Sequence, residues 1–129
     1  DDGLIRIEVP NDCSDFQSLM REKGMANDEH IVYPDHISYF NFETLANFLK
    51  KIKFKIVKIH GDFPIELYQL NKHSNYIING KNGKEAHNNR VEVMNYIYKG
   101  KGVRSTLKFL EGVYEANISR SCVFYIKPI

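Results

Sequence analysis

The residue best suited to chemistry is a histidine just before a predicted helix. His36 lies in the segment Asp35–Phe40, and the amphipathic pattern of the helix begins at Asn41. An imidazole titrates near neutral pH, so His36 could face a substrate as a general base or an orienting group. The simpler interpretation, which we slightly favour, is a loop histidine that bonds the backbone and positions the helix. His36 is therefore the candidate catalytic residue, with a structural role as its alternative.

Aromatic side chains cluster directly after this histidine. Tyr39, Phe40 and Phe42 could surround a cationic group of a ligand, because cations are drawn to the faces of aromatic rings. The alternative is a hydrophobic staple that packs at the start of the helix. Helical periodicity places Phe42 in the core, whereas both interpretations stay open for Tyr39. We therefore take Tyr39 as a candidate substrate-binding residue.

Polar residues at the end of the first predicted strand are further candidates. Asn11 and Asp12 could bind a substrate, or Asp12 could cap the turn that follows, and we weigh the two interpretations evenly. His87 and Arg90 are three residues apart and share a helix face, where they could grip an anionic ligand. A solvated face is the commoner outcome for such a pair, and Arg120 is most simply a surface or ion-pairing residue.

Metal binding and nucleophilic catalysis have little support in the sequence. His30 and His36 are separated by a loop rich in acids, which is not the tight Cys/His spacing of a zinc site. Cys13 and Cys122 are far apart, belong to no Cys-x-x-Cys pair and have no histidine close by in sequence. We therefore predict no metal site and reduced thiols, with a disulfide as the less favoured alternative.

The composition indicates one soluble domain spanning residues 1–129. Hydrophobic residues make up 43% and charged residues 26% of 129 residues, enough for one domain with a core. A net charge of +2 with scattered lysines lacks the footprint of a nucleic-acid binder. No apolar run approaches the roughly 20 residues that a membrane span needs. We therefore expect a cytoplasmic protein that binds neither nucleic acid nor membrane.

Hydrophobic periodicity predicts three strands and about four helices, an α/β or α+β pattern. The strands are 4–9, with one well-buried face, 54–59, which is half-buried, and 122–126, which is apolar on both faces and so interior. The helices are a short one ended by Gly24, one capped by Asn41 or Thr44, then 85–98 and 104–118, with a loop at Lys99–Gly102 between the last two.

The part between the second strand and the third helix is harder to assign. Residues 65–70 fit either a short apolar helix or an extended stretch. Residues 71–84 are rich in Asn, Gly and Lys, which predicts the least ordered part of the chain. In helix 85–98, Val91 and Tyr98 belong to one apolar helical face.

Several pieces of the chain follow a distinctive order: strand, polar loop, His-aromatic segment, helix, strand. They are Gly3 to Asn11 (GLIRIEVPN), Asp35 to Phe40 (DHISYF), Phe54 to Val57 (FKIV) and Asp62 to Glu66 (DFPIE). Together they resemble the C-terminal half of a class I S-adenosylmethionine-dependent methyltransferase. The resemblance implies an α/β fold with a partial Rossmann-like methyltransferase sheet, resembling strands five to seven, and flanking helices. Cys122–Ile126 would be the seventh strand, inserted antiparallel between the fifth and the sixth.

The resemblance implies methyl transfer from S-adenosylmethionine to an O, N or C atom of a small-molecule acceptor. His36 would be the catalytic residue, and Asn11 and Tyr39 would bind the acceptor. The family's glycine-rich loop after a strand is missing, since Gly80–Gly83 lies in a polar loop. Asp1 and Asp2 likewise stand where the family has a Pro-Gly-Gly-like turn. We therefore expect the cofactor-binding half to lie outside this chain, which alone should bind the cofactor weakly.

The alternative to methyl transfer is a function that involves no catalysis. The chain would then be a non-catalytic α/β interaction module that binds a partner or a second copy through an open sheet edge. Under either function Leu4–Val9 lacks a fourth strand with which to pair. We therefore expect a homodimer, or aggregation, when the chain is made alone.

Overall fold

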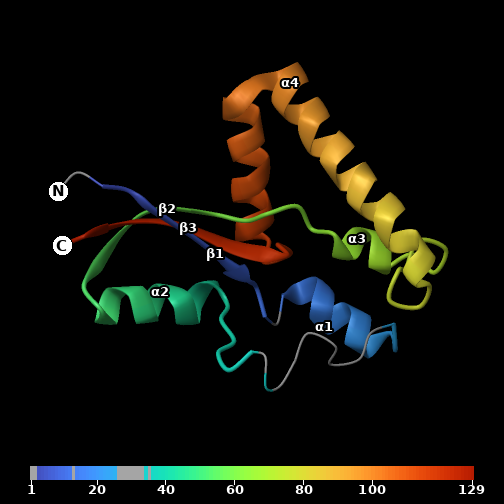
Figure 1. Ribbon diagram of the computed structural model, residues 1–129, viewed down its shortest axis with the longest axis horizontal. Coiled ribbons are helices and arrows are strands. Elements are labelled where there is room, and N and C mark those ends of the chain that lie inside the picture. The colour runs from blue at the N-terminus through green and yellow to red at the C-terminus, as the bar shows by residue number, and fades with distance from the viewer. Residues whose placement is uncertain (1–2, 13, 26–33, 35) are drawn as a thin grey trace.

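The computed structural model describes residues 3–12, 14–25, 34 and 36–129. A small three-stranded antiparallel sheet is surrounded by helices, so the α/β class is confirmed (Figure 1). The elements in chain order are β1 (Ile5–Pro10), α1 (Asp15–Glu22), α2 (Phe42–Lys51), β2 (Phe54–His60), α3 (Glu66–Gln69), the 3₁₀ helix η1 (Gly80–Asn82), α4 (Gly83–Glu115) and β3 (Ser121–Pro128). Among these residues no helix is both long and apolar enough to cross a membrane.

Strand β3 lies in the middle of the sheet, between β1 and β2, and runs antiparallel to both. Pro10 at the end of β1 pairs with Ser121, and His60 at the end of β2 pairs with Val123. β1 and β2 therefore run in the same direction and end where β3 begins. We call this side of the sheet the carboxyl edge. The expected position of the last strand, antiparallel between the other two, is confirmed.

The core of the molecule forms where α2 packs against β3. Cys122, Phe124 and Ile126 of β3 are fully buried and form one cluster with three side chains of α2. Those three are Phe42, Leu45 and Leu49. In Figure 1, α2 lies beneath the sheet and the last part of α4 lies above it. The prediction that 122–126 is an interior strand is therefore confirmed.

Strand β1 is less buried than its sequence predicts. Ile7 and Val9 face the core but are only half-buried, and Leu4 and Ile5 are 54% and 42% exposed. β1 lies at one edge of the sheet, so among the described residues no further strand covers its outer side. The predicted well-buried face of the first strand is therefore wrong.

The start of α2 is set by the capping residues that the sequence predicts. Asn41 Oδ1 accepts a hydrogen bond from the Thr44 N–H, and Thr44 Oγ1 accepts one from the Asn41 N–H, each 2.9 Å long. This reciprocal pair satisfies amide groups that a helix start otherwise leaves without partners. It also fixes the point at which the His36–Phe40 segment ends.

The two helices predicted at 85–98 and 104–118 form one kinked helix, α4. Gly102 has φ 78° and ψ 177°, a conformation that glycine adopts without steric cost. The predicted loop at Lys99–Gly102 is therefore too long, because the helix continues until Gly102 alone breaks it. Figure 1 shows the two limbs meeting at a sharp angle, the first standing away from the sheet. Val91 and Tyr98, which share the apolar face of this first limb, are exposed.

The polar segment 71–84 is more ordered than its composition predicts. Asn75 is fully buried, and its Oδ1 accepts hydrogen bonds from the N–H groups of Ile77 (2.9 Å) and Ile78 (3.2 Å). An asparagine side chain can thereby hold a turn that no repeating pattern announces. The stretch 65–70 contains the short helix α3, one of its two predicted forms.

Candidate functional site

Polar residues from three separate parts of the chain meet at the carboxyl edge. Asn11 follows β1, Asp62 follows β2, and Ser119 precedes β3. Ser119 joins the other two, because its carbonyl accepts from Asn11 Nδ2 (3.0 Å) and its Oγ accepts from the Asp62 N–H (2.7 Å). In α/β sheets, ligands bind beyond the carboxyl ends of strands that run in the same direction. The carboxyl edge is therefore where the structure is best placed to hold a ligand.

One half of this edge is a groove beside the end of β1. Asp12 Oδ2 accepts a hydrogen bond from the Phe40 N–H (3.1 Å), and the Asp12 N–H donates to the Phe40 carbonyl (2.8 Å). This pair holds the segment before α2 against the strand. The groove between them has a volume of about 300 Å³ and is lined by Val9, Pro10, Asp12, His36, Ile37, Ser38 and Phe40. It is the size of a small ligand pocket, apolar with a few polar groups.

The three predicted site residues occupy different parts of this region. His36 is exposed and lines the groove, and its ring meets that of Tyr39 edge-on with centroids 6.3 Å apart. Tyr39 therefore supports the imidazole from the side rather than forming the groove wall. Asn11 is fully buried and does not line the groove, and its amide nitrogen donates to the Ser119 carbonyl. Its Oδ1 has no hydrogen-bond partner among the described residues.

Asp12 does not take the capping role weighed from the sequence. Ser14, not Asp12, caps α1, through a bond from the Gln17 N–H to Ser14 Oγ. The Asp12 carboxylate instead accepts the Phe40 N–H and so holds the groove wall in place. A substrate-binding role for Asp12 stays a prediction, since Asp12 also lines the groove.

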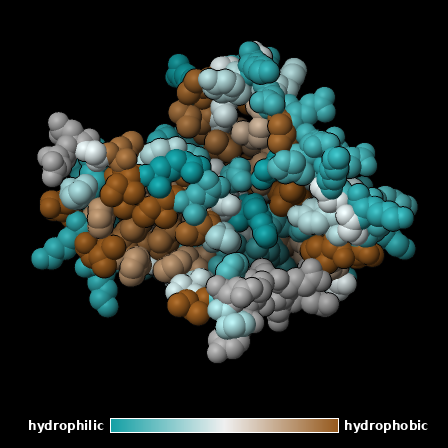
Figure 2. All heavy atoms as spheres, in the orientation of Figure 1, coloured by the Kyte–Doolittle hydropathy of each residue, from teal (hydrophilic) through white to brown (hydrophobic). Residues whose placement is uncertain are grey.

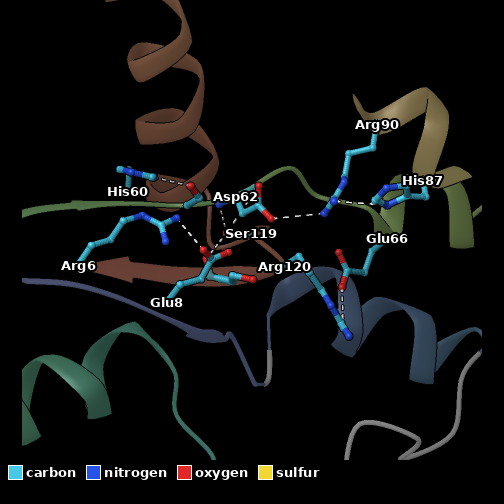
Figure 3. Close-up of polar contacts among 11 residues, drawn as sticks. Arg6, Glu8, His60, Asp62, Glu66, His87, Arg90, Ser119 and Arg120 are labelled. Carbon is cyan, nitrogen blue, oxygen red and sulfur yellow. Dashed lines mark hydrogen bonds and ion pairs between the residues drawn. The ribbon is translucent and has the colours of Figure 1, made fainter. Parts of the chain in front are cut away.

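The other half of the carboxyl edge holds two arginine–acid pairs (Figure 3). Arg120 Nη1 lies 3.3 Å from Glu66 Oε1, and Arg90 Nη1 lies 3.6 Å from Asp62 Oδ2. His87 Nδ1 lies 3.4 Å from Arg90 Nη2, so the two residues share a face as their spacing predicts. The solvated face expected for the pair is confirmed for His87, which is exposed, but not for Arg90, which is half-buried and turns toward Asp62.

Burial changes the acid–base properties of this half of the edge. The Glu66 side chain is only 1% exposed, and desolvation raises its pKa above the ordinary value, against the opposing effects of its own amide and of Arg120. Desolvation likewise raises the pKa of Tyr76, where Arg120 and Arg90 act in the opposite direction and Glu66 adds to the rise. The pKa of Glu66 therefore reflects burial opposed by Arg120, and the pKa of Tyr76 reflects burial and the charges of Arg120, Glu66 and Arg90.

Neither metal nor thiol chemistry finds support in the part of the chain that the structure describes. No three His, Cys, Asp or Glu side chains lie close enough there to hold a metal ion. Cys122 is a buried free thiol, and desolvation raises its pKa to about 12, which leaves it protonated and inert. The other cysteine, Cys13, lies outside the described residues, as does His30.

Sequence reasoning missed some of the residues that build this site. Ser119 and Tyr76 carry no motif, and a lone serine before a strand gives no signal of its role. Glu66 could have been suspected, because an acid within the apolar stretch Ile65–Leu70 must pair or lose its charge when buried. Chain comparison adds nothing to this geometry: no protein-family model, curated protein or solved structure matches the chain.

Proposed function

We propose that the chain is the acceptor-binding part of an S-adenosylmethionine-dependent methyltransferase. The observation that carries the proposal is the place of β3, antiparallel between two strands that run in the same direction. This is the arrangement that the resemblance of the sequence implies for strands five to seven of that family. The finer description, a partial Rossmann-like methyltransferase sheet, belongs to the same proposal.

The groove beside β1 gives the chain a way to bind the acceptor. It lies at the carboxyl edge, where the loop after the first strand and the His36–Phe40 segment meet. His36 would hydrogen-bond the nucleophilic atom of the acceptor and orient it, while Ile37 and Phe40 exclude water. Methyl transfer to a good nucleophile depends more on alignment of the two reactants than on proton transfer. The acceptor is a small molecule, in keeping with the groove's volume of about 300 Å³.

The described residues do not fit the cofactor itself. S-adenosylmethionine supplies an electrophilic methyl group, and the family holds it on a glycine turn after a strand. Gly61 follows β2, but a Cβ atom there would lie 2.7 Å from Ser119 Oγ and 3.1 Å from Val113 Cγ1. Side chains of the protein already fill that space, so Gly61 serves close packing and leaves no cradle. The space beside Gly61 therefore offers no support for cofactor binding, and the proposal assigns that task to another part of the enzyme.

Calorimetric titration with S-adenosylmethionine tests this division of labour. The 129-residue chain alone should show no tight binding. The product of the whole coding region that contains it should bind the cofactor and transfer a labelled methyl group from it to an acceptor. Low-micromolar affinity of the chain alone would overturn the acceptor-half assignment. Absence of cofactor binding by the whole product would overturn the methyltransferase proposal itself.

A specific surface favours the second candidate, a non-catalytic interaction module. Figure 2 shows hydrophobic side chains gathered over the end of the molecule where β1 begins and α2 ends. The exposed ones there include Leu4 and Ile5 of the β1 segment and Phe48 and Ile52 of the α2 segment. An exposed apolar edge strand invites pairing with another chain.

The chain alone should therefore form a homodimer in solution. Ile5→Lys places a charge on the open edge of β1 and should return the chain to a monomer, measured by light scattering over a concentration series. Ile78→Lys is the matched control, because it adds the same charge at an apolar side chain that is also exposed, 64% against 42% for Ile5. A wild-type chain that stays monomeric and melts cooperatively would argue against edge pairing.

A further inference from the structure

We infer that the groove beside β1 binds a small organic amine, whose cationic nitrogen pairs with the carboxylate of Asp12. The inference rests on the proposed function, which assigns the groove to the methyl acceptor, and it adds the chemical class of that acceptor. Asp12 is the one acid among the described residues that line the groove, and no lysine or arginine is found among them. The groove therefore presents a negatively charged wall to its ligand.

The structural role of Asp12 does not require a charge. Its Oδ2 accepts the Phe40 N–H (3.1 Å), a bond that the amide oxygen of an asparagine would accept as well. The charge nevertheless acts on its surroundings, because burial and, second to it, Asp12 raise the pKa of the Cys122 thiol. A carboxylate that is half-buried gives up part of its hydration, and a cationic ligand would offset that cost.

An aromatic ring lines the same groove as this charge. The ring belongs to Phe40, and the ring of Phe48 supports it with centroids 5.7 Å apart. A cation is attracted by a carboxylate and also by the face of an aromatic ring. Two hydrogen bonds hold Asp12 and Phe40 together, one through the Asp12 carboxylate and one from the Asp12 N–H. The charge and the ring are therefore in place before a ligand arrives, which lowers the cost of binding.

The rest of the groove suits an apolar ligand body. Ile37 is largely exposed and Val9 is half-buried, and both line the groove. A ligand that covers them removes apolar surface from water. The volume of about 300 Å³ admits a molecule about the size of one substituted ring. Under the proposed function, the ligand is a small apolar amine, and His36 orients the atom that receives the methyl group.

Nuclear magnetic resonance titration of the 129-residue chain tests the site without any methyl transfer. The probes are benzylamine, benzyl alcohol and benzoate, which share a ring and differ in charge, at an ionic strength held constant with sodium chloride. Benzylamine should produce saturable shifts of the amides of Asp12, Ser38 and Phe40, and should bind about tenfold or more tightly than benzoate. Shifts that do not saturate, or benzoate that binds as tightly as benzylamine, would overturn the amine site.

The variant Asp12→Asn removes the charge and keeps an oxygen for the Phe40 N–H. It should weaken the binding of benzylamine by about tenfold, the worth of one charge-assisted hydrogen bond, and leave that of benzyl alcohol unchanged. Asp15→Asn is the matched control, because Asp15 also accepts a side-chain hydrogen bond, from Asn117, but does not line the groove. Equal weakening by the two variants would assign the effect to net charge and contradict the inference.

A second position keeps the test independent of any loss of structure at Asp12. Ile37 is 84% exposed, so a substitution there changes the groove without removing a core side chain. Ile37→Lys places a cation in the groove and should weaken the binding of benzylamine while strengthening that of benzoate. Ile37→Gln is the neutral control and should keep the preference for the amine. Benzylamine affinities that are equal in these two variants would count against the site.

The outcomes separate this inference from the proposed function. Preferred binding of benzylamine in the groove, together with a whole product that fails to bind S-adenosylmethionine, would keep the amine site and remove the methyl acceptor as its ligand. A whole product that binds S-adenosylmethionine, together with a groove that shows no preference for benzylamine, would keep the methyltransferase proposal and refute the amine site.

Discussion

Replacing Arg120 with methionine should lower the free energy of unfolding by about 3 kcal/mol at neutral pH, because the change leaves the buried Glu66 carboxylate without its cation. Methionine keeps much of the apolar stem that arginine packs, so the loss reports the charge rather than a cavity. Adding Glu66→Gln to the variant should recover most of the loss, since an amide needs no counter-ion. Urea unfolding of the wild type, the two single variants and the double variant measures the coupling free energy between Arg120 and Glu66.

The pH dependence of the same variant identifies the group responsible. Desolvation already raises the pKa of Glu66, and without Arg120 the pKa should rise further. An acid whose pKa is raised by folding binds its proton more tightly in the folded state, so stability falls as the pH rises from the ordinary value of 4.5 through the raised pKa. The deficit should therefore be smaller near pH 4.5 than at neutral pH. A deficit that is equal at both, or one matched by Arg104→Met, would assign the loss to packing.

In the complete methyltransferase that we propose, replacing His36 with alanine should lower turnover by about 10- to 100-fold, at or below the usual contribution of general acid–base groups. Under the proposed function, cofactor affinity should not change, because His36 lines the groove that the proposal assigns to the acceptor. His36→Gln should recover part of the rate, since its amide still forms a hydrogen bond but takes no proton at neutral pH.

Three measurements on the same variants separate catalysis from structure. Turnover, cofactor affinity and melting temperature are compared for the two His36 variants and for His73→Ala, another exposed histidine, whose hydrogen bonds come from its backbone. A helix-positioning role for His36 would instead lower the melting temperature and leave the rate per folded molecule intact. Full turnover in a folded His36→Ala protein would remove the residue from the site.

Local signals in the sequence predicted the elements that carry the site. Asn41 and Thr44 form the cap that their spacing indicates, and the apolar run Cys122–Ile126 is the interior strand. His87 and Arg90 meet because residues three apart share a helix face. These predictions succeed because each depends on neighbours within about one helical turn or on one strand.

The contacts that assemble the site depend on pairing across the chain, which no local pattern encodes. The bond between Asp12 and Phe40 spans 28 residues, and the one between Arg120 and Glu66 spans 54. The order of strands in the sheet decides which acid contacts which arginine. The pairs therefore cannot be predicted from the sequence without that order. The kink of α4 differs from the predicted loop at Lys99–Gly102 for another reason: the backbone leaves helical geometry at Gly102 alone.

The central place of β3 bears on how the protein is made. β1 and β2 share no hydrogen-bonded ladder, because each pairs with β3, which is the last of the three strands in sequence. During synthesis, no part of the sheet can therefore form until residues 121–128 have left the ribosome. Until then, the apolar strands and α2 must remain without their partners, and the long separation between paired residues slows the final step. The loss of only the last strand would therefore abolish the whole sheet.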